Sequence, residues 1–210
     1  LDYVIVANSR VRLTAIDSID AGIRLHIIDS ILALPELNAA PPGRVIDIGT
    51  GGGYPGVPLA LLSGRSFVLT DSVRKKVNAV EDYLRHEESS INASSVSARA
   101  EELAGDASHR ESYSAVVARA LSALPSLVEL AAPLLLMGGH LIAMKGGITQ
   151  EELDRGVHAA SLCGMSPKSV RRFELPVSGE QRSVIVFEKT SLPTIDLPRR
   201  TGLAQRRPLA

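Results

Sequence analysis

The chain has 210 residues, of which 45% are hydrophobic and 22% charged, as in an ordinary globular protein with a buried core. Its 23 Lys and Arg residues balance its 23 Asp and Glu residues, so any nucleic acid must meet a local basic patch. The single cysteine excludes an intramolecular disulfide and a zinc site made of several thiolates. No apolar run is long enough to span a bilayer, and no signal-peptide layout opens the sequence. We therefore expect a cytoplasmic protein with no membrane partner.

The N-terminal part carries apolar residues at helical spacing. Ile23, Ile27 and Ile31 fall on one face of a helix predicted over residues 15–34. The proline-rich stretch 35–44 is expected to break this helix and to mark a domain boundary. Because residue 1 is Leu, we also expect further sequence upstream.

After this boundary, short apolar runs alternate with amphipathic stretches. Strands are predicted at residues 44–48, 66–71, 93–98, 114–120, 139–146, 168–175 and 182–189. Helices are predicted at residues 56–63, 73–87, 124–136 and 149–164, the last with Thr149 as its N-cap. This order predicts an α/β fold with a mostly parallel seven-stranded sheet, helices on both faces and a C-terminal antiparallel hairpin. The expected division is a short N-terminal helical region (1–40), a main domain (41–190) and a basic C-terminal tail (191–210).

A glycine-rich loop follows the first predicted strand, where parallel α/β sheets bind their ligands. Gly51, Gly53 and Gly56 match the dinucleotide fingerprint G-x-G-x-x-G, whereas Gly49, Gly51 and Gly53 match G-x-G-x-G. The fingerprint needs its first glycine directly after the strand, and counting from Gly49 places its third glycine at Tyr54. The dinucleotide phasing therefore fails. An ordinary turn would not need so many glycines, because each one costs conformational entropy.

Two carboxylates indicate the charge of the ligand. Asp47 lies two residues before the loop, where it would repel a pyrophosphate and attract an ammonium or a sulfonium group. Asp71 ends the second predicted strand and is placed to accept hydrogen bonds from two ribose hydroxyls, as in NAD-binding proteins. Together these two residues predict S-adenosylmethionine as the cofactor.

The stretch VIDIGTGGGYPGVPLA at residues 45–60 resembles the signature of the RsmG (GidB) family of 16S ribosomal RNA methyltransferases. Further segments that resemble this family, in the same order, are LTAI (13–16), LHIIDSI (25–31), LTDSVRKK (69–76), ARAEEL (98–103), VVARAL (116–121), MKGG (144–147) and LPRRTGLAQRRPL (197–209). The chain departs from the family pattern at Ala7, where Trp is usual, and at Tyr54, where Phe or Leu is commoner.

The resemblance implies a class I methyltransferase (Rossmann-like) fold that methylates N7 of a specific guanine in 16S rRNA near the decoding site. It implies that Gly49 and Tyr54 lie on the methionine and ribose side, that Asp71 holds the ribose, and that Ala100 and Glu101 flank the adenine. With Arg119 completing the pocket, the expected cofactor-binding residues are Asp47, Gly49, Gly51, Gly53, Tyr54, Asp71, Ala100, Glu101 and Arg119.

The chemistry of guanine N7 predicts a site without a catalytic base. N7 carries an in-plane lone pair and no proton, so its methylation needs proximity and alignment rather than proton transfer. We predict no catalytic residue in that sense and no metal. Arg119 and Lys145 each end a predicted strand at the ligand edge, where either could touch a phosphate or guanine O6. His26 and Asp29 share a helical face, and both a local contact and a role at the RNA stay open for them.

The expected partner is 16S rRNA or the small ribosomal subunit, bound by a monomer. The RNA-binding residues predicted from local charge are Lys145, Arg199, Arg200, Arg206 and Arg207, with a merely flexible basic tail as the alternative. Three other functions remain: a class I methyltransferase for another substrate, a non-catalytic RNA-binding module that keeps the cofactor pocket, and a nucleotide-dependent oxidoreductase.

Overall fold

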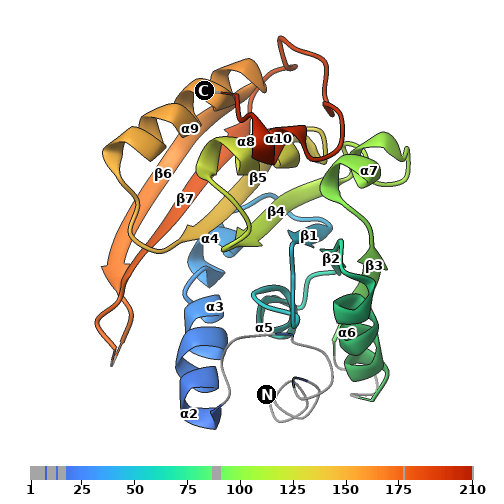
Figure 1. Cartoon of the computed structure of the whole chain (residues 1–210), viewed down its shortest axis with the longest axis vertical. Coiled ribbons are helices and arrows are strands. Elements are labelled where there is room, and N and C mark those ends of the chain that lie inside the picture. Colours follow the sequence, from blue (N-terminus) through green and yellow to red (C-terminus); the bar gives the residue numbers. More distant parts are fainter. Residues whose placement is uncertain (1–7, 9–12, 14–17, 87–90, 177, 210) are drawn as a thin grey trace.

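Seven strands in the described part of the chain form one mixed sheet (Figure 1). The structure is a computed structural model that describes residues 8, 13, 18–86, 91–176 and 178–209. In spatial order the strands are β3 (Ala93–Ser97), β2 (Phe67–Asp71), β1 (Val45–Ile48), β4 (Tyr113–Arg119), β5 (Leu135–Lys145), β7 (Gln181–Lys189) and β6 (Met165–Glu174). Strand β7 is antiparallel to both of its neighbours, and the other pairings are parallel. The predicted mostly parallel sheet with a C-terminal antiparallel hairpin is confirmed.

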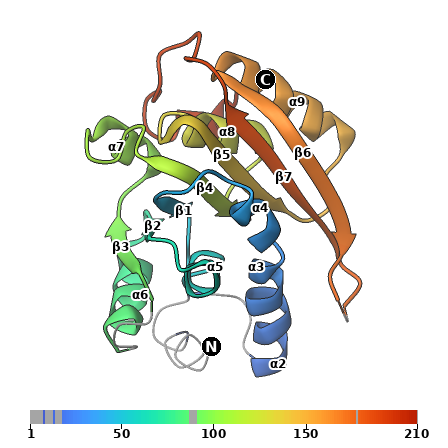
Figure 2. The same ribbon diagram turned by 180° about the vertical axis from the view of Figure 1, so that it is seen from behind.

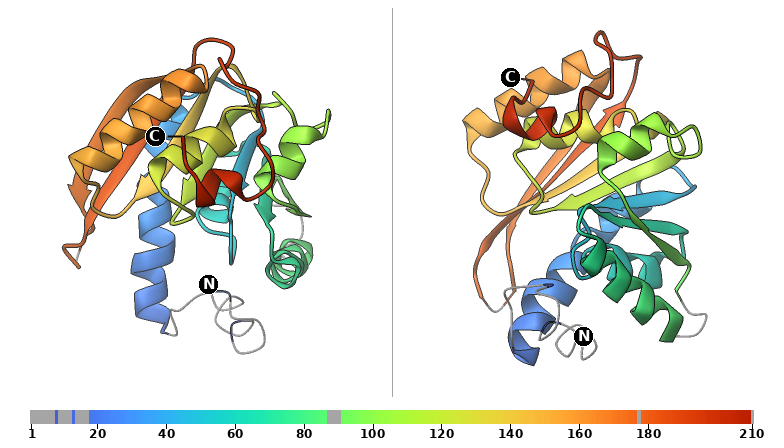
Figure 3. Two further views of the ribbon diagram at one scale, coloured as in Figure 1. Left: turned by 45° about the horizontal axis from the view of Figure 1, so that its top comes forward. Right: turned by 45° about the vertical axis from the view of Figure 1, so that its right-hand side comes forward.

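Helices cover both faces of this sheet (Figures 2 and 3). On one face lie α7 (Ala100–Gly105), α8 (Leu124–Ala131), α9 (Gln150–Leu162) and the short α10 (Leu203–Arg206). On the other lie α3 (Asp29–Ile31), α4 (Leu34–Asn38), α5 (Gly56–Ser63) and α6 (Arg74–His86). The α2 helix (Ile19–Gly22) and a π-helical stretch, η1 (Ile23–Ile28), lead into α3.

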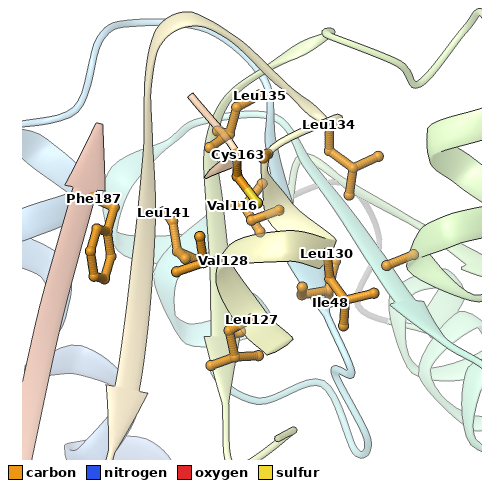
Figure 4. Close-up of a cluster of buried hydrophobic side chains, with 14 of the residues drawn as sticks. Ile48, Val116, Leu127, Val128, Leu130, Leu134, Leu135, Leu141, Cys163 and Phe187 are labelled. Atoms are coloured by element: carbon orange, nitrogen blue, oxygen red, sulfur yellow. The ribbon is translucent and has the colours of Figure 1, made fainter. Parts of the chain in front are cut away.

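The core on the α8 face joins strands, helices and the C-terminal end of the chain. Figure 4 shows Val116, Leu141 and Phe187 of the strands against Leu127 and Val128 of α8, all completely buried. Each such side chain contributes roughly 1.5–3 kcal/mol by leaving water. This core holds the carboxyl ends of the strands in place, where the candidate site lies.

Several predicted boundaries were wrong, and prolines explain two of them. The stretch from residue 35 does not end the helical region, because Pro35 lies in the first turn of α4, where no intrahelical N–H is needed. The helix predicted over 124–136 ends at Ala131, because Pro133 cannot donate a helical hydrogen bond, and β5 already begins at Leu135. Residues 15–17 of the first predicted helix lie outside the described residues.

Two further short helices were not predicted, and one of them lies in the stretch predicted to be a basic tail. Helix α7 follows β3, and α10 lies within the stretch 197–209, where it packs against α8. Both helices are too short to show helical periodicity in the sequence. Among the described helices, none combines the length and the apolar character that crossing a membrane would require.

The sheet order places one loop at a topological switch point. Strand β1 pairs with β2 on one side and with β4 on the other, and the three strands are parallel. The connections of β1 and β4 therefore leave the sheet toward opposite faces, which opens a crevice beyond their carboxyl ends. The glycine-rich loop after β1 lies at this crevice.

Candidate functional site

The glycine loop has the conformation that its spacing predicts. Gly49, Gly51 and Gly53 all have positive φ angles, of 78°, 57° and 95°. Residues with a Cβ rarely adopt this region, so the three glycines of the G-x-G-x-G phasing are the ones that the backbone requires. The N–H groups of Gly49 and Thr50 donate to the carbonyl of Thr70, at 2.8 and 2.9 Å, and tie the loop to the end of β2.

Asp47 is completely buried and organises this loop from within. Its Oδ2 accepts hydrogen bonds from Thr50 Oγ1 at 2.7 Å and from the N–H of Gly56 at 2.9 Å. Burial raises the pKa of Asp47 to about 6. Within the described residues Oδ1 has no hydrogen-bond partner, which leaves one buried acceptor free. A direct contact between Asp47 and a ligand stays a prediction.

Asp71 joins the end of β2 to the same loop. Its Oδ2 accepts a hydrogen bond from the N–H of Gly51 at 3.1 Å, and its Oδ1 accepts one from Val73 at 2.8 Å. These two bonds fix the carboxylate at the mouth of the crevice while leaving further lone pairs available.

A cavity, which we call the Asp71 cavity, lies beside this carboxylate. It is lined by Ile48, Gly49, Thr70, Asp71, Ser72, Ala98, Arg99, Ala100, Glu101, Leu121, Leu130 and Gln205. Four of the predicted cofactor-binding residues, Gly49, Asp71, Ala100 and Glu101, are therefore brought together. Sequence reasoning missed Gln205, which reaches the cavity from the C-terminal end of the chain.

A second cavity, which we call the Arg119 cavity, opens at the ends of β4 and β5. It is lined by Leu25, His26, Asp29, Arg119, Ala120, Met144, Lys145, Gly146 and Arg182. Arg119 is not a lining residue of the Asp71 cavity, although it was predicted to complete the cofactor pocket. Its Nη1 donates to the carbonyl of Leu25 at 2.9 Å and lies 3.4 Å from Asp29 Oδ2.

Asp29 is the centre of the charge network in the Arg119 cavity. The other oxygen, Oδ1, accepts a hydrogen bond from Arg182 Nε at 3.2 Å. The Asp29 carboxylate, 8% exposed, thus faces two guanidinium groups, Arg119 and Arg182, and Arg182 also pairs with the exposed Glu180 at 2.7 Å. Sequence reasoning missed Arg182. The hairpin pattern held a signal for it, because the pairing of Lys145 with Ser183 places Arg182 next to the end of β5.

His26 connects this network to the glycine loop. Its ring stacks on Tyr54 with centroids 4.6 Å apart and an interplanar angle of 9°, and its Nδ1 lies 3.3 Å from Arg119 Nη2. Burial and the positive charge of Arg119 lower the pKa of His26 to about 4. The imidazole is therefore neutral near pH 7, and Nδ1 is an acceptor for the guanidinium.

Ala120, which lines the Arg119 cavity, lies where the chain turns from one cavity to the other. It has a φ angle of 52°, in the left-handed region that costs a residue with a Cβ roughly 1–2 kcal/mol. Through this turn, Arg119 lines one cavity and Leu121 lines the other. The residues at the carboxyl end of β4 thus contribute to both cavities, so the two cavities are neighbours.

The predicted RNA-binding residues divide into paired and exposed groups. Lys145 Nζ donates to Ser122 O at 2.9 Å and lies 2.8 Å from Glu152 Oε1. Arg199 forms a two-pronged ion pair with Glu129, which is 3% exposed, with Nε 2.7 Å from Oε1. The arginines with exposed side chains are Arg200, Arg206 and Arg207.

The strand order, the glycine loop and the acidic residue that ends β2 are those of a class I methyltransferase fold. The structure is similar to the crystal structure of a SAM-dependent methyltransferase from Methanosarcina mazei, with a TM-score of 0.60, 17% identity and coverage of 75% of this chain and 98% of that chain. It is also similar to geranyl diphosphate methyltransferase in complex with SAM, with a TM-score of 0.60, 12% identity and coverage of 77% and 84%.

The chain belongs to the GidB family, rRNA small subunit methyltransferase G, whose family model matches residues 1–185. Relatives named ribosomal RNA small subunit methyltransferase G are 40% identical in Deinococcus radiodurans, over 96% of this chain and 80% of the relative, and 36% identical in Desulfitobacterium hafniense, over 99% and 86%. A third, from Rubrobacter xylanophilus, is 41% identical over 88% of this chain and 72% of the relative. The family predicted from the sequence is confirmed.

Proposed function

We propose that this protein transfers the methyl group of S-adenosylmethionine to N7 of a guanine in 16S rRNA of the small ribosomal subunit. The observation that carries the proposal is the pair of cavities on either side of Ala120, one suited to a nucleoside and the other rich in hydrogen-bond donors. The names of the relatives, which specify small-subunit ribosomal RNA, support the choice of substrate.

The residues of the Asp71 cavity fit the adenosine end of the cofactor. The Asp71 carboxylate can accept hydrogen bonds from both ribose hydroxyls, and Leu121 and Leu130 supply apolar surface for the adenine ring. Glu101 and Ala100 line the same cavity. When bound, S-adenosylmethionine supplies an electrophilic methyl group on a sulfonium.

The glycine loop fits the cationic end of the same cofactor. Gly49, Gly51 and Gly53 let the backbone approach a ligand closely, since no Cβ intervenes. The Oδ1 of Asp47, which has no hydrogen-bond partner among the described residues, is a buried acceptor near this loop that could take a hydrogen bond from an ammonium group. Tyr54 orders the far side of the loop through its stack on His26.

The Arg119 cavity fits the base to be methylated. Arg119, Arg182 and Lys145 are donors for guanine O6 or for a neighbouring phosphate. N7 attacks with its lone pair and releases no proton, so the neutral His26 and the paired Asp29 need not act as bases. Their role is to hold the two arginines in place, and rate enhancement comes from alignment.

RNA is bound outside the cavities by the exposed arginines of the C-terminal stretch. Arg200, Arg206 and Arg207 offer charge to phosphates, whereas Arg199 is already engaged by Glu129. Lys145 reaches the rim of the Arg119 cavity from its ion pair with Glu152.

The proposal is tested by incubating the protein with methyl-labelled S-adenosylmethionine and small subunits from a strain that lacks this modification. We expect label in 16S rRNA at a guanine N7, mapped by cleavage at the depurinated site. Bound cofactor without label would favour a non-catalytic RNA-binding module, and label in a small molecule would favour another methyltransferase. Calorimetry with S-adenosylhomocysteine and NADH tests the cofactor, since preferential binding of NADH would contradict the proposal.

A further inference from the structure

The C-terminal segment, residues 196–209, is anchored to the domain by buried contacts. Leu197 and Ala204 are buried in the core on the α8 face. The Oγ of the buried Ser126 donates to the carbonyl of Ala204 at 2.9 Å. Arg199 pairs with the buried Glu129 and also donates to the carbonyl of Arg207 at 2.8 Å. These contacts hold both ends of α10, so this segment has a defined position.

One contact joins the segment directly to the cofactor side. The N–H of Gly202 donates to Glu101 Oε1 at 2.7 Å. Gly202 has a φ angle of 77° and lies at the start of α10, where the chain turns back toward α8. The acid expected beside the adenine is therefore held by the C-terminal segment, and the segment passes close to the Asp71 cavity.

Gln205 of α10 lines the Asp71 cavity together with Asp71 and Glu101. Within the described ranges its carboxamide makes no hydrogen bond, although the backbone around it is fixed. A carboxamide presents a donor and an acceptor side by side. One edge of adenine presents the complementary pair, the N6 amino group as donor and the ring nitrogen N7 as acceptor. Gln pairs with these two groups of adenine in protein–DNA complexes.

We propose that the C-terminal segment forms one wall of the cofactor site and that Gln205 is a specificity-determining residue that recognises the adenine edge. The inference rests on the proposed function, since it assumes that the Asp71 cavity takes the adenosine end of the cofactor. Asp71 then binds the ribose hydroxyls, and Leu121 and Leu130 pack on the adenine ring. Gln205 distinguishes the 6-amino group of adenine from a 6-oxo group. The only requirement on the rest of the segment is that it stays anchored.

The experiment compares two ligands on the full chain by calorimetry: S-adenosylhomocysteine and S-inosylhomocysteine, in which a 6-oxo group replaces the 6-amino group. The wild-type protein is expected to prefer the adenosine ligand, because the N7 edge of hypoxanthine offers two acceptors, N7 and O6, to the carboxamide. Gln205→Ala should lower the affinity for S-adenosylhomocysteine about fivefold and leave that for S-inosylhomocysteine nearly unchanged, as loss of a neutral hydrogen bond predicts. Thr201→Ala, an exposed position in the same segment, is the matched control and should change neither affinity.

The outcomes separate this inference from the proposed function. If the wild-type protein binds S-adenosylhomocysteine and Gln205→Ala keeps the wild-type preference between the two ligands, Gln205 does not read the base and the cofactor assignment stands. Equal losses for both ligands would show that Gln205 only supports the wall, which overturns the specificity role. If the wild-type protein binds neither ligand, the cofactor assignment and this inference both fail.

Discussion

The two cavities beside Ala120 are built in different ways. The Asp71 cavity lies beside the glycine loop, which is held by its own N–H groups and two carboxylates. Four charged side chains line the Arg119 cavity, and its central ion pairs join distant segments, since Asp29 lies 90 positions from Arg119 and 153 from Arg182. The Asp71 cavity also has the smaller volume, about 70 Å³ against about 350 Å³ for the Arg119 cavity.

This difference predicts how each cavity responds to change. A loop held by several backbone N–H groups keeps its shape when one side chain is replaced, so ligand affinity should change while stability is retained. A buried charge network loses stability when one partner is removed, because another charge then remains without compensation in a medium of low polarity. The Arg119 cavity should therefore be the more sensitive to substitution and to pH.

The largest expected effect is on stability, from removal of Asp29. Asp29→Ala leaves Arg119 and Arg182 facing each other without their shared carboxylate. We expect the free energy of unfolding, measured in urea, to fall by about 3 kcal/mol. Asp82→Ala removes one of the two exposed partners of Arg85 and should cost almost nothing. Equal losses for the two variants would show that the network adds no more than a surface ion pair.

The matching change in the other cavity is Asp71→Asn. It removes the charge but keeps one acceptor for the loop, so the fold should be retained. Loss of charge-assisted hydrogen bonds to the ribose should weaken S-adenosylhomocysteine binding about 30-fold in calorimetry, or about 2 kcal/mol. Asp29→Asn serves as the comparison, with affinity expected to change less than that. The contrast between the cavities breaks down if Asp71→Asn lowers stability more than it lowers affinity.

The pH dependence of stability tests the Arg119 cavity through His26. Its pKa is lowered to about 4, so the unfolded chain binds this proton more readily than the folded chain. Stability contributed by the neutral ring is present above pH 6.5 and is lost as the pH falls toward 4. Between pH 7 and 5 this loss amounts to about 2 kcal/mol.

Asp47 acts in the opposite direction over an overlapping range, since its pKa is raised to about 6 and its protonation favours the folded state as the pH falls. The measurement is therefore the difference between the wild-type protein and His26→Gln, each unfolded in urea at pH 7 and pH 5. The variant should lose less stability than the wild type on acidification. Parallel behaviour of the two proteins would contradict a buried neutral His26.

The smallest effect is expected at the surface. Replacing Arg200, Arg206 and Arg207 by Ala should weaken binding to small subunits about tenfold at moderate salt and flatten its salt dependence, because phosphate contacts are lost. S-Adenosylhomocysteine affinity should not change, because the anchors of the segment, Ser126 and the Arg199–Glu129 pair, remain. Unchanged RNA binding in the triple variant would assign RNA recognition to the Arg119 cavity alone.

Local patterns predicted much of the fold. Alternation of apolar runs with amphipathic stretches predicted the positions of β1, β2, β4 and the long helices α6 and α9. Burial of one or both faces of such an element produces a regular pattern of apolar residues in the sequence. Helix ends were less predictable. Pro35 begins a helix, whereas Pro133 follows the end of one, and the residue type alone does not distinguish these two positions.

The sequence by itself determined the glycine loop, because its requirements are local. Three positive φ angles call for glycine at positions 49, 51 and 53, and the carboxylates that hold the loop stand at the ends of the two adjacent strands. Only the tertiary structure decided which distant residues complete the two cavities. Arg182 reaches Asp29 because of where β7 pairs in the sheet, and Gln205 reaches the Asp71 cavity because buried contacts fold the C-terminal segment back over α8. Such contacts depend on strand order and on packing between segments far apart in the chain. The local spacing of apolar residues indicates neither the strand order nor this packing.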